Sequence, residues 1–383
     1  MEPKRILVVD DSALMRRLVS RALEGQPDIT VDGTAADGLL ALAAIERRPP
    51  DLVTLDVEMP NLDGLATVAR IHQRWPRLPV IMCSTLTAGG AAVTLDALAR
   101  GASDYIAKPS STAGLDANLQ AFGDELVRKV RALLRPRRPS APGAAPMPMP
   151  GAAPAPIPAV VAPASSPAAP AVPLPRVART ARTQPRLLAI GASTGGPNAL
   201  AEVLRHLPDK LPVPVVIAQH MPPVFTRLLA ERLDALCKLP VREGTDGAEL
   251  LPGQVWLAPG DRHMLLVSRG GRVTLHLDQG PPVHFCRPAV DPMLQSAATC
   301  YGGDVLTVIL TGMGRDGQQG CTQLAALGGT VYAQDEASSV VWGMPGAVAQ
   351  AGVAQRVLPL AAIGPAIAAA LGEPAPGRLR DVG

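Results

Sequence analysis

Three residues in the second half of the chain have the types and the setting to perform acyl chemistry together. Ser193 and His220 each follow an apolar run, and Asp316 lies in a glycine-rich segment after a third run. A serine hydroxyl becomes a nucleophile when a base takes its proton, an imidazole can be that base, and a carboxylate fixes the imidazole tautomer. We therefore interpret Ser193, His220 and Asp316 as candidates for a nucleophile, its base and the residue that orients the base.

The glycines around Ser193 leave a second interpretation open. Gly191, Ser193 and Gly195 fit G-x-S-x-G, in which small neighbours let a nucleophile sit on a tight strand-to-helix turn near free backbone N–H groups. Glycines after a strand could equally surround a phosphate. A dinucleotide site needs an acid at the end of its second strand, where His220 stands, and α/β-hydrolases place their acid before the histidine. Both of these families are disfavoured. Alone, His220 could be a core or surface residue, and Asp316 a helix N-cap.

A second set of polar residues occupies the ends of apolar runs in the first half. Asp10 and Asp11 follow the first run, Asp56 the third, Ser84 the fourth and Lys108 the fifth. Carboxylates that converge on one edge favour a hard divalent cation such as Mg²⁺, and a nearby lysine can pair with a transferred phosphoryl group. Each acid taken singly could be a solvated loop residue. Their shared position at strand ends indicates a site.

The elements that must position these residues alternate between strands and helices. Expected strands in the first half are 6–9, 29–34, 52–55, 80–83 and 105–106, with helices at 13–23, 38–47, 65–74, 91–99 and 115–134. Expected strands in the second half are 187–192, 213–219, 254–258 and 305–310, with helices at 198–206, 225–236 and 321–327 and a hairpin at 264–267 and 273–276. Such βα units predict two doubly wound α/β domains whose sites lie at the carboxyl edges of parallel sheets.

A proline-rich segment separates the two halves. Residues 136–175 hold 14 of the 41 prolines, and residues 126–187 carry ten basic residues and no acid, so the rest of the chain is net acidic despite the overall +3. We expect an extended linker, with nucleic-acid binding or recognition by a peptide-binding module as minor alternatives. The five cysteines are scattered without a C-x-x-C pair, and no long apolar segment occurs. A cytoplasmic protein with reduced thiols is expected.

The first half resembles the receiver domain of two-component response regulators. The matching segments are LVVDDS (7–12), LDVEMP with DG (55–60, 63–64) and GASDYIAKP (101–109). The resemblance implies a flavodoxin-like fold of five parallel strands, in which Asp56 accepts a phosphoryl group from a histidine kinase. It further implies Mg²⁺ binding by Asp10, Asp11, Asp56 and the backbone of Glu58, and signalling roles for three residues. Ser84 and Lys108 contact the phosphoryl group, and Tyr105 is the switch aromatic.

The second half resembles the catalytic domain of the chemotaxis protein-glutamate methylesterase (CheB) family. The matching segments are IGASTGGP (190–197), QHMP (219–222), RPAVD (287–291), LTGMGRDG (310–317) and QDE with GMP (334–336, 343–345). The resemblance implies a triad of Ser193, His220 and Asp316, with Thr194 and Met313 near the oxyanion and no cofactor in the esterase site. The linker is longer and richer in Pro and Ala than is usual in this family.

Together these features predict a receiver at 1–125, a linker at 126–185, a methylesterase domain at 186–375 and a tail at 376–383. The expected function is phosphorylation-activated hydrolysis of glutamate methyl esters on methyl-accepting chemoreceptors, with methanol released, and deamidation of receptor glutamines. Two alternatives stay open. The second domain could be an inert, phosphorylation-dependent adaptor, or the receptor array could control an output other than motility. The sequence does not specify the receptors, the target glutamates or the oligomeric state.

Overall fold

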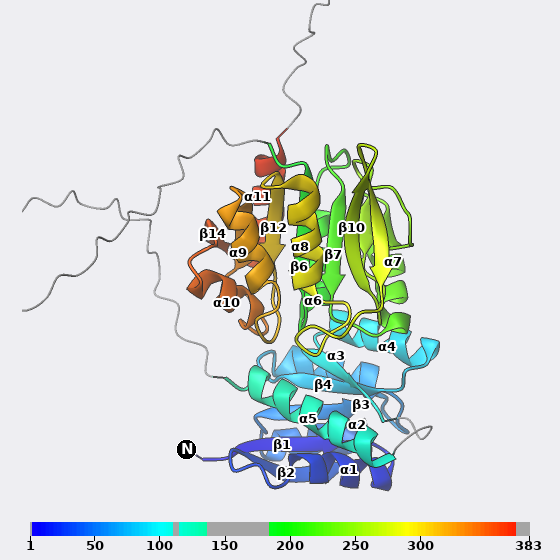
Figure 1. The fold of residues 1–383 in the computed structure, drawn as a ribbon. Helices are drawn as coiled ribbons and strands as arrows, with labels where there is room; N and C mark the ends of the chain where they lie inside the picture. Colours follow the sequence, from blue (N-terminus) through cyan, green and yellow to red (C-terminus); the bar gives the residue numbers. More distant parts are fainter. Residues whose placement is uncertain (1, 110–114, 136–183, 373–383) are drawn as a thin grey trace, which may run out of the picture.

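The computed structural model describes residues 2–109, 115–135 and 184–372, which form two α/β domains in contact (Figure 1). The expected linker lies mostly, and the expected tail wholly, outside the described residues. None of the helices in these ranges combines the length and apolar character needed to cross a membrane.

The N-terminal domain is the predicted five-stranded parallel sheet, and its strand order is β2-β1-β3-β4-β5. Its strands are β1 (Lys4–Val9), β2 (Ile29–Ala35), β3 (Leu52–Asp56), β4 (Val80–Ser84) and β5 (Asp104–Ala107). Its helices are α1 (Ala13–Leu23), α2 (Gly38–Arg47), α3 (Gly64–Arg74), α4 (Ala88–Ala99) and α5 (Leu115–Leu133). Helices α1 and α5 cover one face, and α2, α3 and α4 cover the other. Leu126 and Val130 of α5, which follow the expected boundary at residue 125, are buried in this core.

The C-terminal domain is a seven-stranded parallel sheet in the order β14-β13-β12-β6-β7-β9-β8, beside the antiparallel hairpin β10-β11. Its strands are β6 (Leu187–Ala192), β7 (Val215–Gln219), β8 (Val241–Glu243), β9 (Val255–Leu257), β10 (His263–Arg269), β11 (Arg272–Asp278), β12 (Val305–Ile309), β13 (Thr330–Gln334) and β14 (Arg356–Leu358). Its helices are α6 (Gly196–Arg205), α7 (Pro223–Leu236), α8 (Val290–Tyr301), α9 (Gln318–Ala326), α10 (Met344–Gln350) and α11 (Leu360–Leu371). Helices α6, α7 and α11 pack on one face; α8, α9, α10 and the hairpin pack on the other.

The central strands β6, β7 and β12 bring the candidate catalytic residues together. These strands are buried on both faces, which explains their continuous apolar sequences. They are neighbours in the sheet and run parallel, so their carboxyl ends lie at one edge. Ser193, His220 and the segment that carries Asp316 follow these ends. The topology therefore supplies the convergence that the sequence predicted.

The two domains share a continuous apolar core. Helix α4 of the first domain packs against α6 and α7 of the second, and Figure 1 shows it where the domains meet. The Tyr105 ring stacks on Phe225, with centroids 4.5 Å apart and an angle of 15° between the planes. Arg232 also pairs with Asp96 across the boundary, at 2.8 Å. The N-terminal domain thus lies on the edge of the C-terminal sheet that holds Ser193.

Candidate active site and phosphoacceptor site

The turn that carries Ser193 is held by hydrogen bonds on both sides. Ser193 N donates to Thr311 O at 3.0 Å, while its carbonyl oxygen accepts from Gly196 N at 2.7 Å and from Gln219 Nε2 at 2.9 Å. Gly195 has a φ of 77°, and a Cβ there would come within 2.6 Å of the side chain of Val340. A glycine is therefore required at the turn, because both the conformation and the space exclude a side chain.

His220 is paired with Asp316 through its Nε2 atom, which lies 2.7 Å from Oδ2. The Asp316 carboxylate also accepts hydrogen bonds from the backbone N–H groups of Val290, Asp291 and Gly317, at 2.6, 2.9 and 2.9 Å. Although burial would raise the pKa of Asp316, His220 and these donors hold it below its usual value. The ionised carboxylate assigns the proton to Nε2, so Nδ1 is the nitrogen left to act as a base.

The pKa of His220 is shifted strongly by its neighbours. Burial on its own would lower the pKa of His220, but the hydrogen bond to Asp316 and the neighbouring Cys286 thiol raise it to about 10. No described residue forms a hydrogen bond with Ser193 Oγ. Ser193 and His220 line one cavity, but no hydrogen bond joins their side chains in the described ranges. A protonated imidazole cannot accept a proton from serine, so the ring must lose its second proton before it can act as a base.

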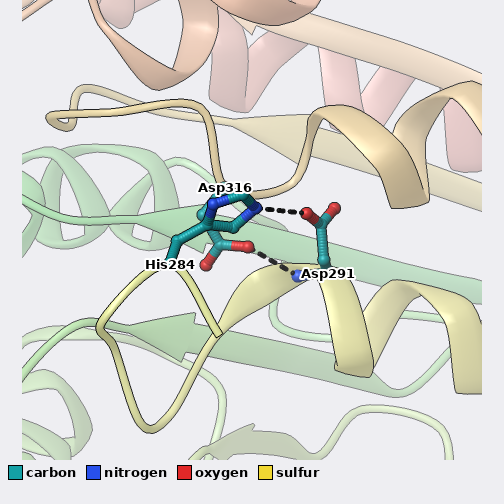
Figure 2. A group of neighbouring side chains, drawn as sticks. All are labelled: His284, Asp291 and Asp316. Atoms are coloured by element: carbon teal, nitrogen blue, oxygen red, sulfur yellow. Dashed lines mark hydrogen bonds and ion pairs between the residues drawn. The ribbon is translucent and has the colours of Figure 1, made fainter. Parts of the chain in front are cut away.

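A second buried carboxylate supports Asp316 from behind. Asp291 is 1% exposed, accepts a hydrogen bond from Gly320 N at 2.8 Å and contacts His284 Nε2 at 3.1 Å. Figure 2 shows His284 and Asp291 beside Asp316, with the Asp291 backbone N–H directed at the Asp316 carboxylate. His284, Asp291 and Asp316 are close enough to be considered as metal ligands. The Asp316 oxygens, however, already face three N–H groups and His220, which fits a fixed anion better than a ligand.

The site opens into a cavity of about 740 Å³ between the two domains. Ser193, Thr194, His220 and Met313 line it from one side, and residues of β5 and α5 line it from the other. The Thr194 hydroxyl donates across the boundary to the Asp104 carboxylate at 2.8 Å, and Lys129 Nζ lies 2.7 Å from the same carboxylate. The first domain therefore binds the residue next to the candidate nucleophile.

The structure gives roles to two residues that sequence reasoning missed, Gln219 and Asp104. Each stands directly beside a residue that was identified, His220 or Tyr105. Only the side-chain directions in the folded chain reveal their contacts. Met313, expected near the oxyanion, lines the cavity.

The acidic residues of the first domain also converge. Asp10, Asp11 and Asp56 have carboxylate oxygens within 4.8 Å of one another. Lys108 Nζ lies 2.7 Å from Asp56 Oδ1 and 2.9 Å from Asp10 Oδ2. Burial raises the pKa of Asp56, with Lys108 opposing part of that rise. Asp10 Oδ2 is buried, and the Lys108 ammonium is the cation that neutralises it. A cluster of three carboxylates suits Mg²⁺, which prefers oxygen ligands.

The remaining residues expected at this site lie around the three acids. Glu58 is exposed in the loop two residues after Asp56. Ser84 ends β4, and its hydroxyl donates toward the carbonyl oxygens of Thr85 and Gly90, each at 3.1 Å. Tyr105 is buried against Phe225, so the expected switch aromatic contacts the second domain directly.

Comparison with known proteins gives matches over both domains. Residues 188–367 match the CheB methylesterase family, and residues 6–120 match the response regulator receiver domain family. The protein-glutamate methylesterase/protein-glutamine glutaminase of Azospirillum brasilense is 46% identical over 374 residues, covering 96% of this chain and 92% of its own. Protein-glutamate methylesterase/protein-glutamine glutaminase 1 of Paramagnetospirillum magneticum is 48% identical over 366 residues, covering 94% of each chain. The crystal structure of the Thermotoga maritima CheB methylesterase catalytic domain is 44% identical, with a TM-score of 0.47, covering 48% of this chain and 98% of that one.

Proposed function

The chain belongs to the family of protein-glutamate methylesterases/protein-glutamine glutaminases that carry a receiver domain, and we propose that Ser193, His220 and Asp316 perform its hydrolysis. The substrates are glutamate methyl esters of methyl-accepting chemoreceptors, and the reaction serves adaptation in chemotaxis. The observation that carries the proposal is the His220–Asp316 pair beside the Ser193 turn, in a cavity that the receiver covers.

The chemistry follows from the positions of the three side chains. His220 Nδ1 takes the proton of the Ser193 hydroxyl while Oγ attacks the ester carbonyl, and the same proton then passes to the leaving methanol. Water hydrolyses the acyl-enzyme in a second step and regenerates the carboxylate. Asp316 stabilises the imidazolium in both steps, and groups at Thr194 and Met313 stabilise the oxyanion. A glutamine substrate forms the same acyl-enzyme and releases ammonia, which accounts for deamidation.

The receiver regulates this chemistry through the contacts at the boundary. In the resting form Asp104 binds Thr194, and the receiver covers the cavity from which a protein substrate must enter. A phosphoryl group on Asp56 adds about two negative charges beside Lys108 and Ser84. These residues move toward it, Tyr105 leaves its place against Phe225, and the boundary loosens.

Asp10, Asp11, Asp56 and the backbone of Glu58 would hold Mg²⁺ in the receiver. The ion would neutralise the charge of these carboxylates and of the phosphoryl group. Lys108 contacts Asp56 and Asp10 and offsets part of the same negative charge. The phosphodonor is a histidine kinase, and the protein acts in the cytoplasm on the cytoplasmic helices of the receptors.

The test of the proposal is methanol release from membranes that carry methylated receptors, in the presence of a phosphodonor and Mg²⁺. Ser193→Ala abolishes release, whereas Ser268→Ala, at an exposed position of β10, leaves it unchanged. Retention of activity by Ser193→Ala contradicts the assignment of the nucleophile. A fluorophosphonate probe separates this proposal from an inert adaptor. The probe labels Ser193 if the protein is an enzyme, and it labels no serine if the protein is an adaptor.

A further inference from the structure

A strained turn lies at the mouth of the cavity. Val283 and Cys286 exchange two backbone hydrogen bonds, of 3.0 and 2.9 Å, across a two-residue turn. Both central residues are left-handed, with φ of 51° at His284 and 63° at Phe285. Turns of this kind normally contain glycine, which has no Cβ, or asparagine, which tolerates the left-handed conformation better than most residues. The chain therefore maintains an unfavourable conformation at two successive residues.

The fold ties this turn down on both sides. His284 Nε2 lies 3.1 Å from the buried carboxylate of Asp291. Figure 2 shows this contact as a dashed line. Just beyond the turn, Arg287 donates to the carbonyl oxygens of Gln279 and Gly280, at 3.1 and 2.8 Å. The turn thus cannot relax without straining the contact of His284 with Asp291 or the hydrogen bonds of Arg287.

The effect of this conformation is to place an aromatic ring in solvent. Phe285 is 90% exposed, more than any other large apolar residue in the described ranges. It lines the cavity together with Ser193 and His220. Its one aromatic contact in these ranges is with the Arg128 guanidinium of α5, 5.8 Å from the ring centroid. Burying an exposed aromatic ring against another apolar group lowers the free energy. Aromatic residues are therefore frequent anchors of protein interfaces.

We propose that Phe285 contacts the protein substrate, packing against apolar side chains of the receptor helix three or four residues from the modified glutamate. This inference rests on the proposed function, since it names how the same site recognises its substrate. Residues three and four apart share one side of a helix, so a helix whose glutamate reaches Ser193 presents such neighbours to the rim of the cavity. In the resting form the Arg128 guanidinium lies 5.8 Å from the ring centroid and leaves most of the ring in solvent. Loosening of the receiver removes Arg128 and gives the substrate access to the rest of the cavity.

Phe285→Ala in the full-length, fully phosphorylated protein tests the proposal. We expect kcat/KM for methanol release from receptor membranes to fall about tenfold, through KM, because a small side chain loses the apolar contact. The rate at which a fluorophosphonate labels Ser193 stays unchanged, because the triad is intact. Phe285→Leu restores most of the affinity. Leu251→Ala, at another exposed apolar residue of the same domain, has no effect.

Two results contradict the inference. One is a KM for Phe285→Ala within twofold of that of the wild type. The other is a parallel fall in fluorophosphonate labelling, which assigns the turn to support of the triad instead. Failure of the proposed function would give a different result. The wild-type protein would then release no methanol, and the fluorophosphonate would label none of its serines.

Discussion

At the scale of single residues, the site is controlled by which atoms carry protons. The Asp316 carboxylate accepts a hydrogen bond from His220 Nε2 and three more from backbone N–H groups. This arrangement leaves one nitrogen, Nδ1, for the chemistry and fixes the ring against rotation. It also favours the charged imidazolium, which helps the transition state but hinders the resting base.

A pH profile follows from this charge balance. The pKa of His220 is raised to about 10 in the resting form, so the neutral ring, which is the proposed base, becomes more abundant as pH rises toward that value. We expect the rate of fluorophosphonate labelling of the unphosphorylated protein to increase continuously from pH 7 to pH 10, about tenfold per unit. Ser193→Ala measured in parallel corrects for labelling elsewhere. A plateau between pH 7 and 8 contradicts the raised pKa.

The residues that sequence reasoning identified share one property. Ser193, His220 and Asp56 each end or follow a buried strand, so an apolar run in the sequence already indicates their position. Gln219 also ends a buried strand, but its role depends on a contact with the turn after the neighbouring strand. Asp104 begins β5 instead of ending it, and its role depends on the other domain. Contacts across a domain boundary could not be predicted from either half alone.

At the scale of elements, the strongest predictions were those with a regular apolar pattern. The five strands of the receiver and the central strands β6, β7 and β12 are confirmed. Sequence reasoning assigned no element to α8, α10, α11 or the short strands β8, β13 and β14. Helix α11 is apolar on most sides and contains Pro365, so it shows no helical period. Strands β8 and β14 have three residues each, too few for an alternation.

The contact between α4 and α6 predicts an effect on basal activity. Asn198 Nδ2 on α6 donates to Leu98 O on α4 at 2.7 Å. Loss of this hydrogen bond in Asn198→Ala weakens the closed form by about 1 kcal/mol, which raises the open fraction roughly fivefold. We expect methanol release by the unphosphorylated protein to rise by that factor, while the rate with saturating phosphodonor stays the same.

A matched control lies on the same boundary. Arg232 and Asp96 form an exposed ion pair, and such pairs contribute little to stability. Arg232→Ala should therefore change the basal rate less than twofold. An equal effect of both substitutions, or none from Asn198→Ala, contradicts the role given to the α4–α6 contact.

At the scale of the whole molecule, the two domains are joined by one apolar cluster. Buried residues of the α2–α4 side of the receiver continue into those of the α6, α7 and α11 side of the catalytic domain. The receiver core around α1 and α5 is a separate cluster. Opening therefore exposes apolar surface at one side of the receiver and leaves its other core intact, so the signal from Asp56 can reach the boundary without unfolding the domain.

This division predicts where phosphorylation changes backbone protection. With acetyl phosphate and Mg²⁺, we expect amide hydrogen exchange to become faster in α4 and in the first turns of α6 and α7, since these segments pack across the boundary. Exchange in α1, β6 and β12 should not change, because these elements lie within cores that stay closed. Asp56→Asn should show no difference between the two conditions, and chelation of Mg²⁺ should remove the difference in the wild type. Faster exchange throughout the receiver would instead mean that phosphorylation loosens the whole domain, and the boundary could then not act as a separate switch.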